Sequence, residues 1–263
     1  MATYTHGHHE SVLRSHNNRT IANSAEYLRS FLTPDSTLLD IGAGPGTITV
    51  EFAEQVAHVT ATEIGEAELA LSQRAAAARG LANLDFAVED AHALSFADDA
   101  FDIVHAHQVL QHVADPVQAL REMRRVARPG GVVAARDADY AGFIWFPLIP
   151  VLDEWLALYH AAARANGGEP DAGRRLLSWA KAAGFDDVTA TVSTWCYATE
   201  EERAGWGGMW ADRILESALA RQAVDTGLAT RADLERMSAG WRQWADAEDG
   251  WYLVPHGEII ARA

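Results

Sequence analysis

The fold is decided by the stretch Leu38-Leu39-Asp40-Ile41-Gly42-Ala43-Gly44-Pro45-Gly46-Thr47, an apolar run that leads into closely spaced glycines. The apolar run predicts a buried strand, and the residues after it predict a tight turn that opens a helix. Glycine adopts turn dihedrals that a Cβ would penalise, and it lets the backbone come close to a ligand. We therefore predict a cofactor-binding turn at the end of this strand.

The spacing of the glycines narrows the choice of ligand. They form G-x-G-x-G rather than the G-x-G-x-x-G that places a diphosphate on a helix N-terminus. The acidic Asp40 precedes them, and a carboxylate suits a cationic ligand better than a diphosphate. The stretch from Leu38 to Thr47 resembles motif I of the class I methyltransferases that depend on S-adenosylmethionine (SAM). This ligand carries an amino group and a sulfonium but no phosphate.

Two further strands end in acidic residues. Residues 56–63 predict a strand that ends in Glu63, about 20 residues after the first glycine, where a doubly wound fold places the carboxylate that binds a ribose diol. Residues 84–88 predict a third strand, followed by Glu89-Asp90-Ala91-His92. The resemblance implies that Asp90 contacts the adenine amino group and that the backbone N–H of Ala91 contacts the adenine ring.

The order of the elements predicts an α/β fold, a doubly wound, mostly parallel seven-stranded sheet with helical lid insertions. Residues 101–106 and 132–136 predict the fourth and fifth strands, and residues 188–197 predict the sixth. Residues 200–224 predict a helix, and residues 251–261 predict a final strand that enters antiparallel at the sheet edge. We expect a single domain over residues 1–263. It divides into an N-terminal cover (1–34), a SAM-binding core (35–139), a substrate lid with the remaining sheet (140–250) and the final strand (251–263).

Composition restricts the partners and the location. The formal charge is −16, which argues against nucleic acid because no basic stripe could neutralise phosphates. The single cysteine, Cys196, excludes an internal disulfide and fits a reducing compartment. No apolar run reaches the roughly 18 residues of a membrane span, and the N-terminus lacks the apolar segment of a signal peptide. We expect a cytoplasmic protein with no metal site, no membrane contact and a small-molecule partner; the oligomeric state stays open.

SAM is the expected cofactor, and nine residues are assigned to its site from the motifs and the strand ends. These are Asp40, Gly42, Ala43, Gly44, Glu63, Ile64, Asp90, Ala91 and Gln108.

Aromatic residues gather in the second part of the chain, because all nine tryptophans follow the fifth predicted strand. Some must pack in the core, but together they predict a substrate chamber walled by rings, which favours a flat, apolar or cationic acceptor. The residues that we expect to contact the substrate are Tyr4, Asp137, Tyr140, Trp145, Trp206 and Trp210.

The expected reaction asks little of the side chains. A sulfonium methyl is already activated, so an in-line displacement gains mainly from holding the acceptor close to it in a dry pocket. Where the acceptor carries a proton, a histidine can take it near neutral pH. His107 and His112 follow the fourth strand and are the expected catalytic bases; otherwise they bond to the backbone or line the cofactor pocket.

The nearest group in this resemblance is the ubiquinone/menaquinone-biosynthesis type of small-molecule methyltransferase. Many of its members carry Leu-His-His after the fourth strand, whereas this chain has His105-Ala106-His107-Gln108, which argues against a quinone acceptor. Two other functions stay open: a nicotinamide-dependent oxidoreductase and a catalytically degenerate fold that acts as a binding partner. The glycine spacing argues against the first, and the intact Asp40, Glu63 and Asp90 argue against the second. The sequence leaves open whether O, N, S or C is methylated.

Overall fold

The computed structural model describes residues 18–263, and within this range the strands form one eight-stranded sheet. The strand order is β3-β2-β1-β4-β5-β8-β6, and β7 pairs with the other edge of β8. Strands β1 to β5 are parallel, while β5, β6 and β7 are all antiparallel to β8. The predicted α/β class with a mostly parallel sheet is confirmed.

The bounds of the elements follow the chain from the first short helices to the last strand. The strands are β1 (Thr37–Ile41), β2 (His58–Glu63), β3 (Leu84–Val88), β4 (Phe101–His107), β5 (Ala127–Ala138), β6 (Ile144–Phe146), β7 (Val188–Tyr197) and β8 (Trp251–Arg262). The helices are η1 (Ile21–Ala25), η2 (Glu26–Phe31), α2 (Thr47–Ala53), α3 (Glu66–Ala78), α4 (Pro116–Val126), η3 (Tyr140–Gly142), α5 (Pro150–Ala165), η4 (Gly173–Arg175), α6 (Leu176–Ala182), α7 (Glu200–Glu216), α8 (Ala218–Asp225) and α9 (Arg231–Asp246).

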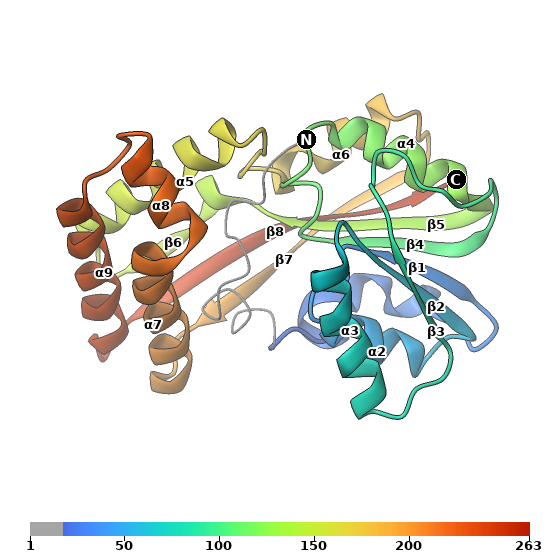
Figure 1. Cartoon of the computed structure of the whole chain (residues 1–263), viewed down its shortest axis with the longest axis horizontal. Coiled ribbons are helices and arrows are strands. Elements are labelled where there is room, and N and C mark those ends of the chain that lie inside the picture. The colour runs from blue at the N-terminus through green and yellow to red at the C-terminus, as the bar shows by residue number, and fades with distance from the viewer. Residues whose placement is uncertain (1–17) are drawn as a thin grey trace.

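The parallel strands are apolar because both faces of the sheet are covered. Helices α4 and α6 pack on one face, and η1, η2 and α2 pack on the other (Figure 1). Leu38 and Leu39 are neighbours on β1 whose side chains enter opposite layers, and both are fully buried. A strand buried on both faces gives a continuous apolar run, which is the signal that the sequence showed.

Three sequence predictions need correction. The last strand, β8, does not lie at the sheet edge but between β5 and β7, which pair with its two sides. The segment after β5 adds a three-residue strand, β6, so the sheet has eight strands within residues 18–263 rather than seven; β6 is too short to show a pattern. The helix expected over residues 200–224 divides at Ser217, which is extended (ψ 178°).

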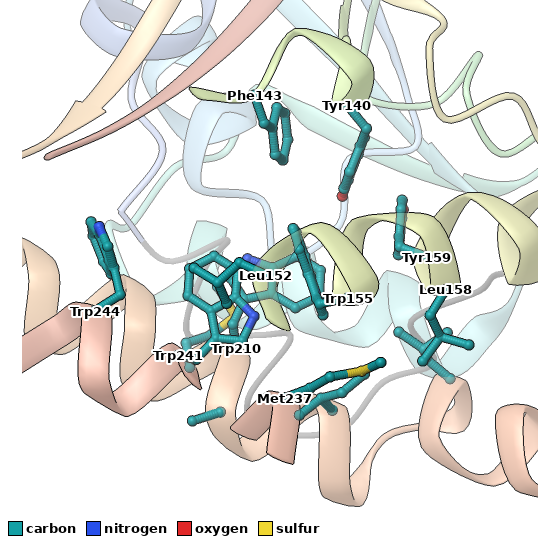
Figure 2. Packing of buried hydrophobic residues seen from close by; sticks show 14 of the residues in the cluster. Tyr140, Phe143, Leu152, Trp155, Leu158, Tyr159, Trp210, Met237, Trp241 and Trp244 are labelled. Atoms are coloured by element: carbon teal, nitrogen blue, oxygen red, sulfur yellow. The ribbon is translucent and has the colours of Figure 1, made fainter. Parts of the chain in front are cut away.

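The second half of the chain forms a separate aromatic layer beyond the sheet. Helices α5, α7 and α9 pack together at the far end of β8, away from the parallel strands (Figure 1). Their facing sides bury Trp155, Trp210, Trp241 and Trp244 (Figure 2). The ring centroid of Trp155 lies 4.6 Å from that of Trp210 and 4.8 Å from that of Trp241, both in edge-to-face geometry. We call this group of rings the aromatic cluster.

Candidate active site

A cavity of roughly 290 Å³ opens at the carboxyl ends of β1, β2 and β4 and reaches the edge of the aromatic cluster. Its walls come from the glycine turn, from the segments after β2, β3, β4 and β5, and from α7. In open α/β sheets, ligands bind at the carboxyl ends of the strands. All nine residues predicted for the cofactor line this cavity.

The glycine turn forms one wall because its backbone takes conformations that other residues avoid. Gly42 and Gly46 have φ values of +67° and +80°. A Cβ at Gly46 would stand 2.8 Å from the Cα of Ser72 on α3, and one at Gly42 would meet Val109. The turn therefore needs glycine both for its dihedrals and for its close packing.

Glu63 is held at the cavity wall by the turn itself. Its Oε1 accepts a hydrogen bond of 2.6 Å from the backbone N–H of Gly44, and its Oε2 accepts one of 3.3 Å from the N–H of Ile64. Burial raises the pKa of Glu63, against the lowering effect of these two N–H groups. A carboxylate fixed in this way offers its remaining lone pairs to a pair of hydroxyl groups, which fits a ribose.

Asp40 has a role that the sequence did not show. Its Oδ1 lies 2.8 Å from Nδ1 of the buried His105, and its Oδ2 accepts a 2.6 Å hydrogen bond from the hydroxyl of Thr49. These bonds connect β1 to β4 and to α2 behind the glycine turn. Asp40 therefore fixes the turn from below, in addition to lining the cavity.

Asp90 lies two residues after the end of β3. Its Oδ1 accepts a 2.9 Å hydrogen bond from the backbone N–H of His92 and lies 2.6 Å from the Nδ1 of that ring. The backbone bond is the main cause that lowers the pKa of Asp90, so its side chain is an anion at neutral pH. Ala91 and the exposed Ile64 complete this side of the cavity.

The two predicted bases differ in their surroundings. His107 is buried, and neither of its ring nitrogens has a hydrogen-bond partner. Burial, together with the guanidinium of Arg19, holds its pKa well below the usual range. His112 lies 2.9 Å through Nε2 from the amide nitrogen of Gln111, and burial lowers its pKa to about 3. Both rings line the cavity and are neutral at pH 7.

The residues predicted for the substrate fall into three groups. Tyr140, Trp206 and Trp210 line the cavity. Trp145 does not, because it lies on β6 and stacks on Tyr252, with ring centroids 5.7 Å apart. Asp137 and Tyr4 complete the set: Asp137 also lies off the cavity, and Tyr4 is outside the described residues.

Asp137 is fully buried under the segment that follows β4. Its Oδ1 accepts a 3.0 Å hydrogen bond from the backbone N–H of Gln111, while its Oδ2 has no partner. Burial raises the pKa of Asp137 to about 7. Its place in the structure is therefore a support for the loop that carries His112 rather than a contact for the substrate.

Sequence reasoning missed several residues of the cavity wall. Arg19, Phe143, Trp195 and Arg213 all line it. The guanidinium carbon of Arg213 lies 4.6 Å from the ring centroid of Trp210, and that of Arg19 lies 5.6 Å from the ring centroid of Trp195. Trp195 lies on the predicted strand over residues 188–197, which could have pointed to it, whereas the two arginines have no distinguishing signal in the sequence.

Residues 18–263 contain neither a metal-binding group nor a membrane-spanning helix. No three His, Cys, Asp or Glu side chains come together there as a metal-binding group. No helix in this range is long and apolar enough to span a membrane.

Comparison with known proteins identifies the family. Residues 39–135 match the family model of a methyltransferase domain. An uncharacterized methyltransferase of Schizosaccharomyces pombe is 32% identical over 270 residues, covering 98% of this chain and 95% of that protein. A demethylmenaquinone methyltransferase of Clavibacter sepedonicus is 31% identical over 57% of this chain and 66% of its own length.

Solved structures share the fold. The YcgJ protein of Bacillus subtilis superposes with a TM-score of 0.57 at 20% identity, covering 97% of this chain and 99% of that one. A phosphoethanolamine N-methyltransferase 2 of Haemonchus contortus, in complex with SAM, gives a TM-score of 0.56 at 18% identity over 90% of this chain and 51% of its own. The nicotinamide-dependent alternative is not supported. The chain belongs to the class I SAM-dependent methyltransferases, and SAM is its cofactor.

Proposed function

We propose that this chain methylates a small organic acceptor that binds among the aromatic rings at the inner end of the cavity. The observation that supports this function is that a single cavity has two different walls, one suited to the cofactor and one made of aromatic rings. The glycine turn, Glu63 and Asp90 form one wall, and Tyr140, Trp206 and Trp210 form part of the other. A cavity of roughly 290 Å³ has the size of a small-molecule site.

The residues at the strand ends fit SAM. The carboxylate of Glu63 suits the ribose diol, Asp90 suits the adenine amino group, and Gly42 and Gly44 let the backbone lie against the ligand. When bound, SAM supplies a methyl group on a sulfonium, which is already activated for displacement. The chain itself must orient the acceptor, exclude water and take up a proton.

His107 is the side chain that we assign as proton acceptor. It is buried at the cavity wall, and both of its ring nitrogens lack a hydrogen-bond partner, so a ring lone pair is available to an acceptor O–H, N–H or S–H. The lowered pKa keeps the ring neutral and also makes it a weaker proton acceptor than an ordinary histidine, so the assignment rests on its position and its unpaired nitrogens. The Nε2 of His112 already lies against Gln111, so we place His112 second.

The rings keep the site dry and orient a flat acceptor. Trp206 stacks on Tyr197 with ring centroids 4.4 Å apart, and Tyr140 stacks between Phe143 and Tyr159 at 4.4 and 4.0 Å. Such stacks fix each ring in place, and catalysis by positioning requires this rigidity. The remaining work is done by holding the acceptor at the methyl group.

The proposal is tested by following the label. The full chain is incubated with SAM tritiated in the methyl group and with a cell extract divided into metabolites, protein and RNA. We expect label in the metabolite fraction, and the Glu63→Ala variant should lose it in parallel with its affinity for SAM. Label in protein or RNA with none in metabolites would overturn the proposal.

A further inference from the structure

Charge is unevenly distributed along the wall of the cavity. The carboxylates that line it lie on and after β1, β2 and β3 or on α3, at the cofactor end: Asp40, Glu63, Glu68, Glu89 and Asp90. The two arginines among the described lining residues, Arg19 and Arg213, stand at the aromatic end instead. In a chain with a formal charge of −16, composition alone would not place positive charge there.

Arg19 is held in place by a chain of hydrogen bonds. Its Nη2 donates to Oε1 of Gln108 at 2.7 Å. The Nε2 of Gln108 donates to Nε2 of His256 at 2.9 Å, and the Nδ1 of His256 donates to the carbonyl oxygen of Val254 at 3.0 Å. In each of these three hydrogen bonds a donor meets an acceptor, so the orientation of the Gln108 amide and of the Arg19 guanidinium is fixed.

The backbone at Gln108 supports the same conclusion. Gln108 has φ +55°, a left-handed conformation that costs energy in a residue other than glycine. Its N–H donates to the carbonyl oxygen of Arg136 at 2.7 Å, so the strain is maintained by β5. The fold therefore holds Gln108 in an unfavourable conformation that presents its amide to Arg19 and His256.

Arg213 brings a second positive charge from the other half of the molecule. It lies on α7, it is buried with 3% of its surface exposed, and its guanidinium lies over the ring of Trp210. A guanidinium binds a carboxylate through two parallel N–H bonds, which fixes the orientation of the ligand.

Resting on the proposed function, we propose that the methyl acceptor is a flat aromatic acid, whose ring packs against Trp195 and Trp206 and whose carboxylate binds the guanidinium of Arg19. Arg213 adds positive charge from α7. His107 and His112 are neutral and add no positive charge at this end of the cavity. An amine cation would be repelled there by the guanidinium groups of Arg19 and Arg213. This replaces the cationic acceptor that the tryptophans alone had suggested.

The test uses three probes of the same shape and different charge. The full chain, saturated with S-adenosylhomocysteine, is titrated by calorimetry with 2-naphthoate, 2-naphthamide and 2-naphthylmethylammonium. We expect the carboxylate to bind about tenfold tighter than the amide or better, because a hydrogen bond to a charged group contributes more than a neutral one, and the ammonium to bind least. Salt should weaken this preference.

Variants assign the preference to its residue. Arg19→Gln should remove most of it, and Arg19→Lys, which keeps the charge, should retain part of it. The matched control is Arg236→Gln, because Arg236 is exposed and pairs with Glu154 far from the cavity. The inference is overturned when the amide or the ammonium binds as well as the carboxylate, when none of the three binds, or when a folded Arg19→Gln variant keeps the preference. Label in metabolites together with a preference for the ammonium would contradict the aromatic acid as acceptor but leave the proposed methyl transfer to a small molecule standing.

Discussion

The two halves of this molecule build their walls of the cavity by different means. Around β1 to β3, the wall is made of backbone and of carboxylates held by that backbone: glycines with positive φ, strand ends, and side chains that accept backbone N–H bonds. Beyond β5, the wall is made of side chains that stack on one another, such as Trp206 on Tyr197. Backbone geometry requires particular residues at fixed spacing, whereas stacked rings can come from any element that reaches the cluster.

This difference predicts that stability and cofactor binding can be separated. The largest effect should come from Trp241→Ala in the aromatic cluster. Trp241 is fully buried and its ring contacts those of Trp155, Trp210 and Trp244. We expect the free energy of unfolding to fall by about 3 to 5 kcal/mol, as for other large-to-small changes in a core. Urea denaturation measures this loss.

The affinity for SAM should stay unchanged in the folded fraction of this variant, because no atom of Trp241 lines the cavity. The matched control is Trp251→Ala, since Trp251 is 36% exposed and should cost much less. A stable Trp241→Ala protein with weak SAM binding would contradict the separation of the two halves.

The second largest effect should come from His107, which lines the cavity between the cofactor wall and the aromatic wall. Replacing it with Gln should lower kcat by about 100-fold, the lower range for loss of a general base, with the dissociation constant of SAM unchanged. His58→Gln is the control, because His58 pairs with Asp85 outside the cavity. Steady-state kinetics and calorimetry separate the two quantities.

The pH profile sharpens this prediction. The neutral ring is the active form, and burial holds the pKa of His107 well below the usual range. Wild-type kcat should therefore stay level as the pH falls from 7.5 through about 6.5, where an ordinary histidine would already be half protonated. A loss of half the rate near pH 6.5 would show that another group with an ordinary pKa controls the reaction.

In the cofactor half, Glu63→Ala should weaken SAM binding by about 1.5 to 3 kcal/mol, because the ribose hydroxyls lose a charged acceptor. The melting temperature should change little. Glu66→Ala, on the exposed first turn of α3, serves as the control and should leave both unchanged. Equal SAM affinity in Glu63→Ala and wild type would leave Glu63 as a capping group for the Gly44 turn only.

The sequence predicted the cofactor half well for a physical reason. The backbone turn requires glycine at its positions, and the expected ribose contact requires a carboxylate at Glu63. The spacing of these residues can therefore be recognised in the sequence. Trp145 and Asp137 were assigned to the substrate because they follow the fifth strand, but the direction of a side chain alternates along extended backbone. Without the register of β6 and β8, the sequence could not distinguish a side chain that packs in the core from one that lines the cavity.

Arg19 and Arg213 were missed for a different reason. Arginine is an ordinary surface residue, and only the packing of α7 against the aromatic cluster shows that Arg213 is buried. The role of Arg19 likewise depends on Gln108, which is 89 positions away in the sequence. Contacts of this kind between distant segments leave no local pattern.

The last expected effect concerns Asp137, whose pKa burial raises to about 7. In the unfolded chain an aspartate titrates near about 4, so between about pH 4 and pH 7 the folded protein binds a proton that the unfolded chain does not. Wild-type stability then falls by about 1.4 kcal/mol per pH unit from this group as the pH rises through that window. Asp137→Asn keeps an acceptor for the N–H of Gln111 and removes the titration.

The variant should therefore gain stability relative to wild type as the pH is raised from 5 to 7. Buried histidines such as His112, whose lowered pKa makes the protein lose stability as the pH falls below about 6.5, act equally in both proteins and cancel in the difference. Urea denaturation at each pH measures the difference in the free energy of unfolding between Asp137→Asn and wild type. The control is Asp35→Asn, at an exposed position, for which this difference should not change with pH. A constant difference across this range would mean that Asp137 is already ionised at pH 5, and its burial would then have to be offset by charge from Arg136.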